Sequence, residues 1–503
     1  MSRVFSRLCS MSLTRRALAR IMASIFFLSL IPLVLIALYN YPADDDFNFV
    51  LPVAQAWVQT GSLWEVVKAI CNKCAYTYAT WQGDFVSTAL FSITPIIFDI
   101  RLYFLSNWFT LALVCLSAGY LIKGVVCVQL RADRDTFWIV YVSVMVLALQ
   151  FLPAIGWSIY WHNGGIYTVT VCFLALLLGL LIRCAAPMTR ARSLLRGVLA
   201  SFLGFLLGGS FYGPMLGALV LLVLITAAAF LLRQPHRRHS LAALAGFAVS
   251  LIISVIAPGN AVRQGLNGDP MNPLSAIVTS VLESFDWAGE WMGPQLWGML
   301  LILLPALWTP LRESHFSFRR PLWVLIALYG LYSAAIVPGV YTHAGYDTER
   351  YLNALYLYFL IFMVGGSIYL EGALIRWLER RKAEGGGANL LEAARGLGTR
   401  YCALLLAASV ALTAFGGFAF TIMNTSSISA AKSLVTGEAA RFRQEMAQRQ
   451  EYVRVTDSDL VDVEVLSSQP YVFKRDRLPL QGIYGTVRYM RMYFELFDGV
   501  ADP

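Results

Sequence analysis

IMASIFFLSLIPLVLIALY, residues 21–39, is the stretch that decides the fold of this chain. It contains no charged residue and is close to the roughly 20 residues that an α-helix needs to cross a bilayer. Backbone polar groups find no water in hydrocarbon, so such a run crosses as a helix that bonds its own backbone. Five arginines precede the run, and ADDDF, residues 43–47, follows it. We therefore expect a membrane-spanning helix with acids at its exit.

The composition extends this expectation to the whole chain. Hydrophobic residues make up 58% of the 503 residues, charged residues make up 14%, and the mean hydropathy is +0.62. A soluble domain of this length does not show such values. The net charge of +9 comes from Lys and Arg in short segments between apolar runs, which is a topology signal of membrane proteins. The sequence predicts an all-α integral membrane protein with no nucleic-acid partner.

Eleven apolar runs are close to the spanning length. They begin at Ile21, Leu102, Thr136, Ile166, Gly197, Met215, Leu241, Gly293, Pro321, Leu352 and Cys402. If all eleven cross, every basic cluster falls on the same side, which the positive-inside rule makes cytoplasmic. This alternation requires that residues 85–100, a short run broken by Pro95, do not cross.

The predicted topology divides the chain into three parts. Residues 1–20 form a basic cytoplasmic N-terminus, residues 21–421 form the transmembrane domain with a large first outer loop at 40–101, and residues 422–503 lie outside. Within the last part, 439–453 is typical of a charged helix, 459–465 alternates like a short strand, and 484–497 is aromatic-rich. We expect a small outer cap of α/β or helical structure.

The outer loops collect the polar residues that could do chemistry, whereas the cytoplasmic loops are short and basic. The chain contains no Gly-x-x-x-x-Gly-Lys-Ser/Thr loop and no Gly-x-Gly-x-x-Gly motif after a strand. These absences argue against an ATP-driven pump and against a dinucleotide-dependent enzyme.

Four outer motifs carry a resemblance. ADDDF at 43–47, YATWQG at 78–83, YWHNGG at 160–165 and APGN at 257–260 are similar to segments of an uncharacterised bacterial multispanning family. The cytoplasmic N-terminus, the single span, the acids beyond it and the long first loop resemble the GT-C glycosyltransferases. One position departs from that family, whose members tend to carry Trp-x-Gly-Arg where this chain has Asp84 after Gly83. An arginine contact to phosphate at that position does not carry over.

The resemblance implies that Asp45 and Asp46 are catalytic, with Asp44 held in reserve. Inverting glycosyl transfer needs a carboxylate that accepts or orients the proton of the attacking hydroxyl group. A second acid could bind a divalent cation such as Mg²⁺ or Mn²⁺, although the sequence identifies no metal ligands. The alternative is an acidic turn that only marks the membrane interface.

A lipid-phosphate leaving group needs cationic partners, because its charge must be neutralised in a poorly hydrated site. Arg263 and Arg350 are the leading candidates, and His162 and His343 could also contact the donor phosphate. Interface anchoring is the alternative role for the arginines, and a structural role is the alternative for the histidines.

Four further residues are candidates for contacts with the acceptor or the sugar: Trp81, Asp84, Tyr160 and Trp161. Aromatic rings at this depth also form the usual interfacial belt. Cys71 and Cys74 lie in the first outer loop, where they either form a disulfide or stay as free thiols.

The resulting expectation is a GT-C type glycosyltransferase of the bacterial cytoplasmic membrane. It would transfer a sugar from a polyprenyl-phosphate donor to an envelope glycan or lipid acceptor at the outer face, and membrane lipids would surround it. The alternatives are a transporter or flippase of lipid-linked sugars and a non-catalytic partner in envelope glycan assembly.

Overall fold

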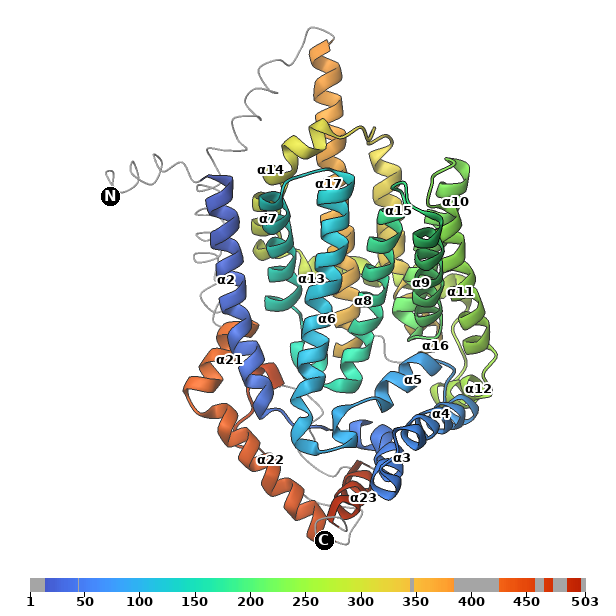
Figure 1. Ribbon diagram of the computed structural model, residues 1–503, viewed down its shortest axis with the longest axis vertical. Coiled ribbons are helices and arrows are strands. Elements are labelled where there is room, and N and C mark those ends of the chain that lie inside the picture. The colour runs from blue at the N-terminus through green and yellow to red at the C-terminus, as the bar shows by residue number, and fades with distance from the viewer. Residues whose placement is uncertain are drawn as a thin grey trace, which may run out of the picture.

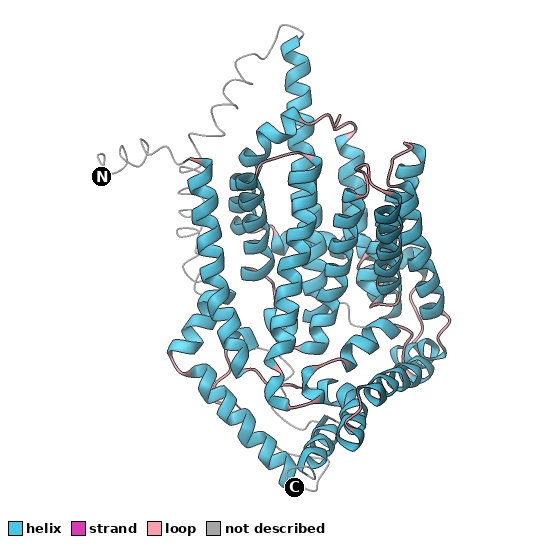
Figure 2. Ribbon diagram, in the orientation of Figure 1, coloured by secondary structure: helices cyan, strands magenta, loops and turns pink. Residues whose placement is uncertain are grey.

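The computed structural model describes residues 14–43, 45–343, 348–383, 425–456, 466–473 and 486–498. Within these residues all regular secondary structure is helical (Figure 2). Long helices run side by side as a bundle, and shorter helices gather at one end of it (Figure 1). The chain is an all-α, multi-pass membrane protein.

The described residues contain nine helices that are long and apolar enough to cross a membrane. They are α2 (Arg15–Ile36), α6 (Phe104–Lys123), α8 (His162–Arg183), α9 (Arg190–Gly208), α10 (Tyr212–Leu231), α11 (Arg237–Val255), α14 (Pro294–Glu313), α15 (Pro321–Ala334) with α16 (Val337–Thr342), and α17 (Glu349–Ala383).

The sequence predicted eleven spans, and two of them are not among these nine. The run that begins at Thr136 forms α7 (Arg134–Met145), which has only 12 residues before a π-helical segment, Val146–Gln150. The run that begins at Cys402 lies outside the described residues. The count of eleven is therefore not established.

Several helices begin where a short polar side chain caps the first turn, whose N–H groups have no partner within the helix. Thr14 accepts a hydrogen bond from the N–H of Ala17 at the start of α2 (3.2 Å). Asp133 accepts from the N–H of Thr136 at the start of α7 (2.8 Å). These caps lie next to basic residues, so they also mark the ends of the apolar runs.

The basic clusters meet at one end of the bundle, which we call the basic end. This end is formed by the starts of α2, α7, α9, α11 and α15 and by the ends of α6, α8, α10, α14 and α17 (Figure 1). This gathering is the pattern that the positive-inside rule predicts for one side of a membrane, while the alternation of eleven spans stays a prediction. Which compartment the basic end faces stays a prediction.

Small residues allow two of the long helices to approach closely. A Cβ atom added to Gly204 of α9 would overlap the carbonyl oxygen of Ala243 in α11, and one added to Gly246 would overlap that of Ser201. Close backbone packing at small residues is the usual way in which membrane helices associate without a hydrophobic driving force.

The opposite end carries the shorter helices. We call it the cavity end, because the cavity of the candidate functional site opens there. The shorter helices are α3 (Asp45–Thr60), α4 (Leu63–Thr80), α5 (Phe85–Ser92), α12 (Pro258–Asn267), α22 (Glu438–Val455) and α23 (Thr486–Asp498) (Figure 1). The predicted first outer loop is thus mostly helical, and α5 has only 8 residues, which is too short to cross a bilayer.

Two more helices complete the described fold. α13 (Pro273–Trp291) packs against α15 and α16, and α21 (Ser426–Val435) packs against α2. α22 confirms the helix predicted at 439–453, whereas the strand predicted at 459–465 lies outside the described residues.

A separate apolar cluster fixes the last described helix to the cavity end. Tyr493 and Phe494 of α23 pack on Phe47 of α3, with ring centroids 5.4 and 5.9 Å away. The hydroxyl group of Tyr493 donates a hydrogen bond to the carbonyl of Ile96 (2.6 Å). α23 therefore forms a wall beside α3.

Candidate functional site

A cavity of about 880 Å³ opens at the cavity end, between helices that are far apart in the sequence. Residues of α3, α4, α8, α12, α17 and α23 line it. Four of the site residues predicted from the sequence are in this lining: Asp45, Trp81, Arg263 and Arg350. The cavity has the size of a typical small-molecule site.

Two of the sequence motifs are joined directly next to the cavity. The side-chain oxygen of Asn260, from APGN, accepts hydrogen bonds from the N–H of Gly83 and from the hydroxyl group of Tyr212 (2.9 Å each). A Cβ atom on Gly259 would collide with the backbone of Trp81. Only glycine permits this approach, which fixes the TWQG turn on the start of α12.

Asp46 joins the other two motifs. Its carboxylate accepts hydrogen bonds from the hydroxyl group of Tyr103 (2.7 Å) and from the N–H groups of Ala43 (3.2 Å) and Asn163 (3.3 Å). Asn163 is the second residue of α8, so the acid also lies at the positive end of that helix dipole. Asp46 is fully buried, and its interactions hold ADDDF against YWHNGG.

The two described acids of ADDDF are thereby separated. Asp45 is exposed and lines the cavity, although it begins the same helix as the buried Asp46. Asp44 lies outside the described residues. Successive helical residues point about 100° apart, so neighbouring acids face different surroundings. Of the described acids, Asp45 is the one in a position to meet a ligand.

Both predicted arginines stand over aromatic rings. The guanidinium group of Arg263 lies 5.6 Å from the ring centre of Trp81. That of Arg350 lies 5.4 Å from Trp161 and 5.6 Å from Tyr167. Cation–π contacts of this kind hold a guanidinium in place while its N–H groups can still bind an anion.

Several polar atoms of the cavity residues have no hydrogen-bond partner within the described part of the chain. They are Nε of Arg350, Oε1 of Gln82 and both amide atoms of Asn163, all of them buried. Buried polar groups are almost always bonded, so these unpaired atoms, which belong to residues of the cavity lining, mark places where a bound ligand or water would complete the hydrogen bonding. The sequence analysis did not identify Gln82 or Asn163 individually.

Lys73 is a third cation in the lining, and it too was missed. Its Nζ atom donates a hydrogen bond to the side chain of Asn48 (3.2 Å) and lies 4.9 Å from the ring centre of Phe49. Burial lowers the pKa of Lys73, and the nearby Asp45 opposes this effect. The helical spacing of Lys73, Thr77 and Thr80 on one face of α4 is the signal that could have identified it.

Asp84 lies behind the cavity rather than in its lining. It is fully buried, and neither carboxylate oxygen has a hydrogen-bond partner of good geometry among the described residues. Burial raises the pKa of Asp84 to about 7, and the charge of Arg263 opposes the rise.

The other predicted site residues lie outside the lining. Nε2 of His162 is 2.9 Å from the carbonyl oxygen of Leu90. The hydroxyl group of Tyr160 donates to the carbonyl of Leu33 (2.8 Å), and Nε1 of Trp161 donates to that of Ala43 (3.2 Å). His343 is exposed after α16. Trp161 nevertheless contributes to the site by supporting Arg350.

The cysteine alternatives are resolved in favour of thiols. Cys71 and Cys74 are both free and lie one turn apart on α4. Burial raises the pKa of Cys74 to about 11, so it carries no thiolate at neutral pH.

The site combines one exposed acid with three cations and aromatic walls. Among the described residues no group of three or more His, Cys, Asp and Glu side chains could hold a metal ion. Chemically, the arrangement can bind an anion at the cations and accept a proton at Asp45. Comparison of the chain with protein-family models, with curated proteins and with solved structures gave no match.

Proposed function

We propose that this protein is a membrane glycosyltransferase of GT-C type that transfers a sugar from a polyprenyl-phosphate donor to an acceptor hydroxyl group. The observation that supports it is the cavity in which Asp45 lies with Arg263, Arg350 and Lys73, next to unpaired polar atoms of Gln82 and Asn163. This set matches a substrate with a phosphate and several hydroxyl groups.

In the proposed reaction the acceptor oxygen attacks C1 of the sugar, and the bond between C1 and the phosphate oxygen breaks. The acceptor proton passes to the carboxylate of Asp45, and polyprenyl phosphate leaves with the bonding electrons. Arg263 and Arg350 bind the departing phosphate, whose negative charge grows in the transition state. Lys73 lies close enough to Asp45 to stabilise its charge before the proton arrives.

The remaining parts of the proposal follow from the topology. The cavity end would face the outside of a bacterial cytoplasmic membrane, since the basic end is expected in the cytoplasm. The acceptor would then be a glycan or lipid of the cell envelope, and the segment from 422 onward would form an outer cap. The exposed ring of Trp81 provides a surface on which a sugar could stack.

Transfer by the purified protein in detergent tests this proposal, because detergent leaves no compartment to transport across. The assay should offer a panel of polyprenyl-phosphate sugars with lipid and glycan acceptors and detect the product by mass spectrometry. Product that forms with the wild type and is lost with Asp45→Asn would support the proposal. No product from any pair, with the protein folded, would count against it.

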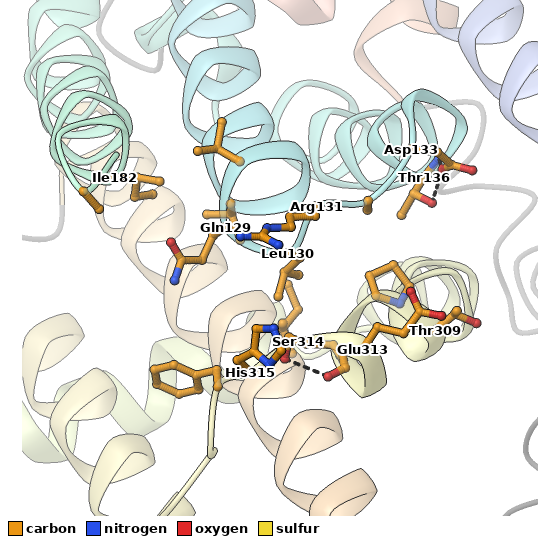
Figure 3. A pocket seen from close by; sticks show the side chains of 18 of the residues that line it. Gln129, Leu130, Arg131, Asp133, Thr136, Ile182, Thr309, Glu313, Ser314 and His315 are labelled. Atoms are coloured by element: carbon orange, nitrogen blue, oxygen red, sulfur yellow. Dashed lines mark hydrogen bonds between the residues drawn. The ribbon is translucent and has the colours of Figure 1, made fainter. Parts of the chain in front are cut away.

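A second cavity favours transport as the competing function. A cavity of about 1080 Å³ opens at the basic end, where Gln129, Arg131 and His315 line it (Figure 3). Alternating access exposes one site near the membrane midplane first to one side and then to the other, so a transporter must be able to open at each end of its bundle. Fully buried side chains such as Leu149, Leu174 and Phe359 belong to the apolar core of the same bundle.

The two functions differ in liposomes. A flippase would move a fluorescent polyprenyl-phosphate sugar from the inner to the outer leaflet, and it would form no glycosidic bond in detergent. Movement without transfer would establish the transporter, and transfer without movement the enzyme. If neither occurs, the non-catalytic assembly role becomes the remaining candidate, and pull-down of partners would test it.

A further inference from the structure

A smaller cavity of about 490 Å³ lies at the basic end, between the start of α15 and the last turns of α17. Its lining includes four arginines and no acidic residue: Arg319, Arg320, Arg376 and Arg380, together with Phe318 and Trp377. It shares Phe318 with the larger cavity of the basic end and has no residue in common with the candidate active site.

Of the four arginines, Arg376 is the one whose side chain is bonded within the described residues. The guanidinium group of Arg376 donates to the carbonyls of Phe316 (3.2 Å) and Arg312 (3.1 Å) and pairs with Glu379 (2.8 Å). Glu379 also pairs with Arg312, so the nearest acid is already neutralised. Arg376 thus holds the α14–α15 connection against α17.

The other three arginines are exposed, and no described residue is an acidic partner for them. Within the described residues no hydrogen bond or ion pair is formed by the side chains of Arg319, Arg320 or Arg380. Arg320 immediately precedes α15, whose first N–H groups add positive potential at the same place. Like charges gathered around a cavity repel each other, so an anion that binds between them relieves this repulsion.

The surroundings of the cavity decide what kind of anion fits. Large apolar side chains next to it are strongly exposed, namely Leu322 and Trp323 on α15 and Leu374 and Trp377 on α17. A soluble anion such as inorganic phosphate gains nothing from such neighbours. A lipid does, because its acyl chains cover apolar helix sides while its headgroup meets the arginines.

We propose that this arginine cavity binds the phosphate headgroup of an anionic phospholipid, with the acyl chains along α15 and α17. Arg319, Arg320 and Arg380 contact the phosphate, and Trp377 lies at the level of the headgroup, as interfacial tryptophans do. Arg376 positions the connection and does not need to contact the lipid.

Binding of phosphatidylglycerol to the purified full-length protein tests the proposal. Fluorescent phosphatidylglycerol is titrated into protein in neutral detergent, with phosphatidylcholine as the uncharged comparison. R319Q/R320Q/R380Q should weaken binding on the order of 10²-fold, since each arginine near a lipid surface contributes about a factor of five. The matched control R190Q/R192Q/R238Q removes three exposed arginines of the same end and should leave binding unchanged.

Three outcomes would overturn the proposal. Equal weakening by the control triple would show that a diffuse basic surface attracts the lipid. Displacement of the lipid by millimolar inorganic phosphate would show a site for the free anion. Equal binding of phosphatidylcholine would remove the role of the phosphate charge. If the triple variant unfolds, Arg320→Gln alone should still weaken binding about fivefold, and no change in that variant would also overturn the proposal.

Discussion

The two ends of the bundle use the same kinds of side chain in different ways. At the basic end, Arg319 and Arg380 are exposed beside apolar helix sides. At the cavity end, Arg263 and Arg350 stand over aromatic rings in a cavity that they share with an acid. The basic end thus presents cations with no acid in the lining beside an apolar surface, as the proposed lipid site requires, whereas the cavity end brings opposite charges together. We therefore assign the chemistry to the cavity end.

The largest effect is expected from the two adjacent acids of the cavity end. Asp45→Asn should lower transfer by about 10²–10⁴-fold with little change in stability, because an amide cannot accept the acceptor's proton. Asp46→Asn should instead lower the midpoint of thermal unfolding, because an amide NH₂ would face N–H donors, at a cost of about 1–3 kcal/mol. Transfer rates and fluorescence-detected unfolding of both variants measure this.

Glu65→Gln serves as the control, since Glu65 is an acid of the same region that pairs with Lys68 outside the cavity lining. The assignment of the two acids would be reversed if Asp46→Asn kept its unfolding midpoint and lost all product while Asp45→Asn stayed active.

The cations of the cavity should have the next largest effect. Arg263→Ala and Arg350→Ala should each lower transfer by about 10²-fold through weaker stabilisation of the leaving phosphate. Lysine at either position should restore only part of the rate, because a point charge replaces the planar guanidinium. Arg101→Ala is the matched control, since Arg101 is exposed and pairs with Asp99. Equal losses in all three variants would point to general electrostatics rather than to direct contact.

Lys73 should have a smaller effect, because it acts on Asp45 and on the bound anion without the bidentate geometry of arginine. Lys73→Gln should raise KM for the donor by roughly tenfold, the scale of one charge-assisted hydrogen bond. Lys68→Gln on the same helix should leave KM unchanged. A normal KM for Lys73→Gln would separate this lysine from donor binding.

The smallest expected effect concerns pH. Burial raises the folded-state pKa of Asp84 to about 7, whereas an unfolded aspartate has a pKa of about 3.9. Between these two pKa values the folded state therefore holds a proton that the unfolded state has lost. The free energy of unfolding accordingly falls as the pH rises from about 4 to 7. Asp84→Asn should remove this dependence of the unfolding free energy on pH and should raise the midpoint of thermal unfolding at pH 8 by roughly a few degrees. Unfolding scans from pH 5 to 8 measure it, and parallel curves for variant and wild type would contradict it.

Hydropathy predicted most of the described helices because each apolar run must satisfy its own backbone in the membrane. It could not establish that the run beginning at Thr136 ends early in a π-helical segment, because that depends on neighbouring helices. The same holds for α13, a helix of 19 residues between the predicted spans that begin at Leu241 and Gly293.

The candidate site was predictable residue by residue but not as an arrangement. Asp45, Arg263 and Arg350 could be selected as outer polar residues, yet their meeting depends on long-range contacts such as that between Asn260 and Gly83. The sequence also cannot separate Asp45 from Asp46, since the difference lies in where α3 begins and which way each residue then points.

One feature of the cavity wall links the site to the order in which the chain is made. Tyr489 and Met492, on the last described helix α23, line the same cavity as Asp45, which lies near the N-terminal end of the described chain. A ribosome releases these residues long after the first helices have entered the membrane. The cavity therefore lacks this wall throughout synthesis and closes only when α23 docks on α3. A nascent chain in which Asp45 and Asp46 have already been made still has an incomplete site.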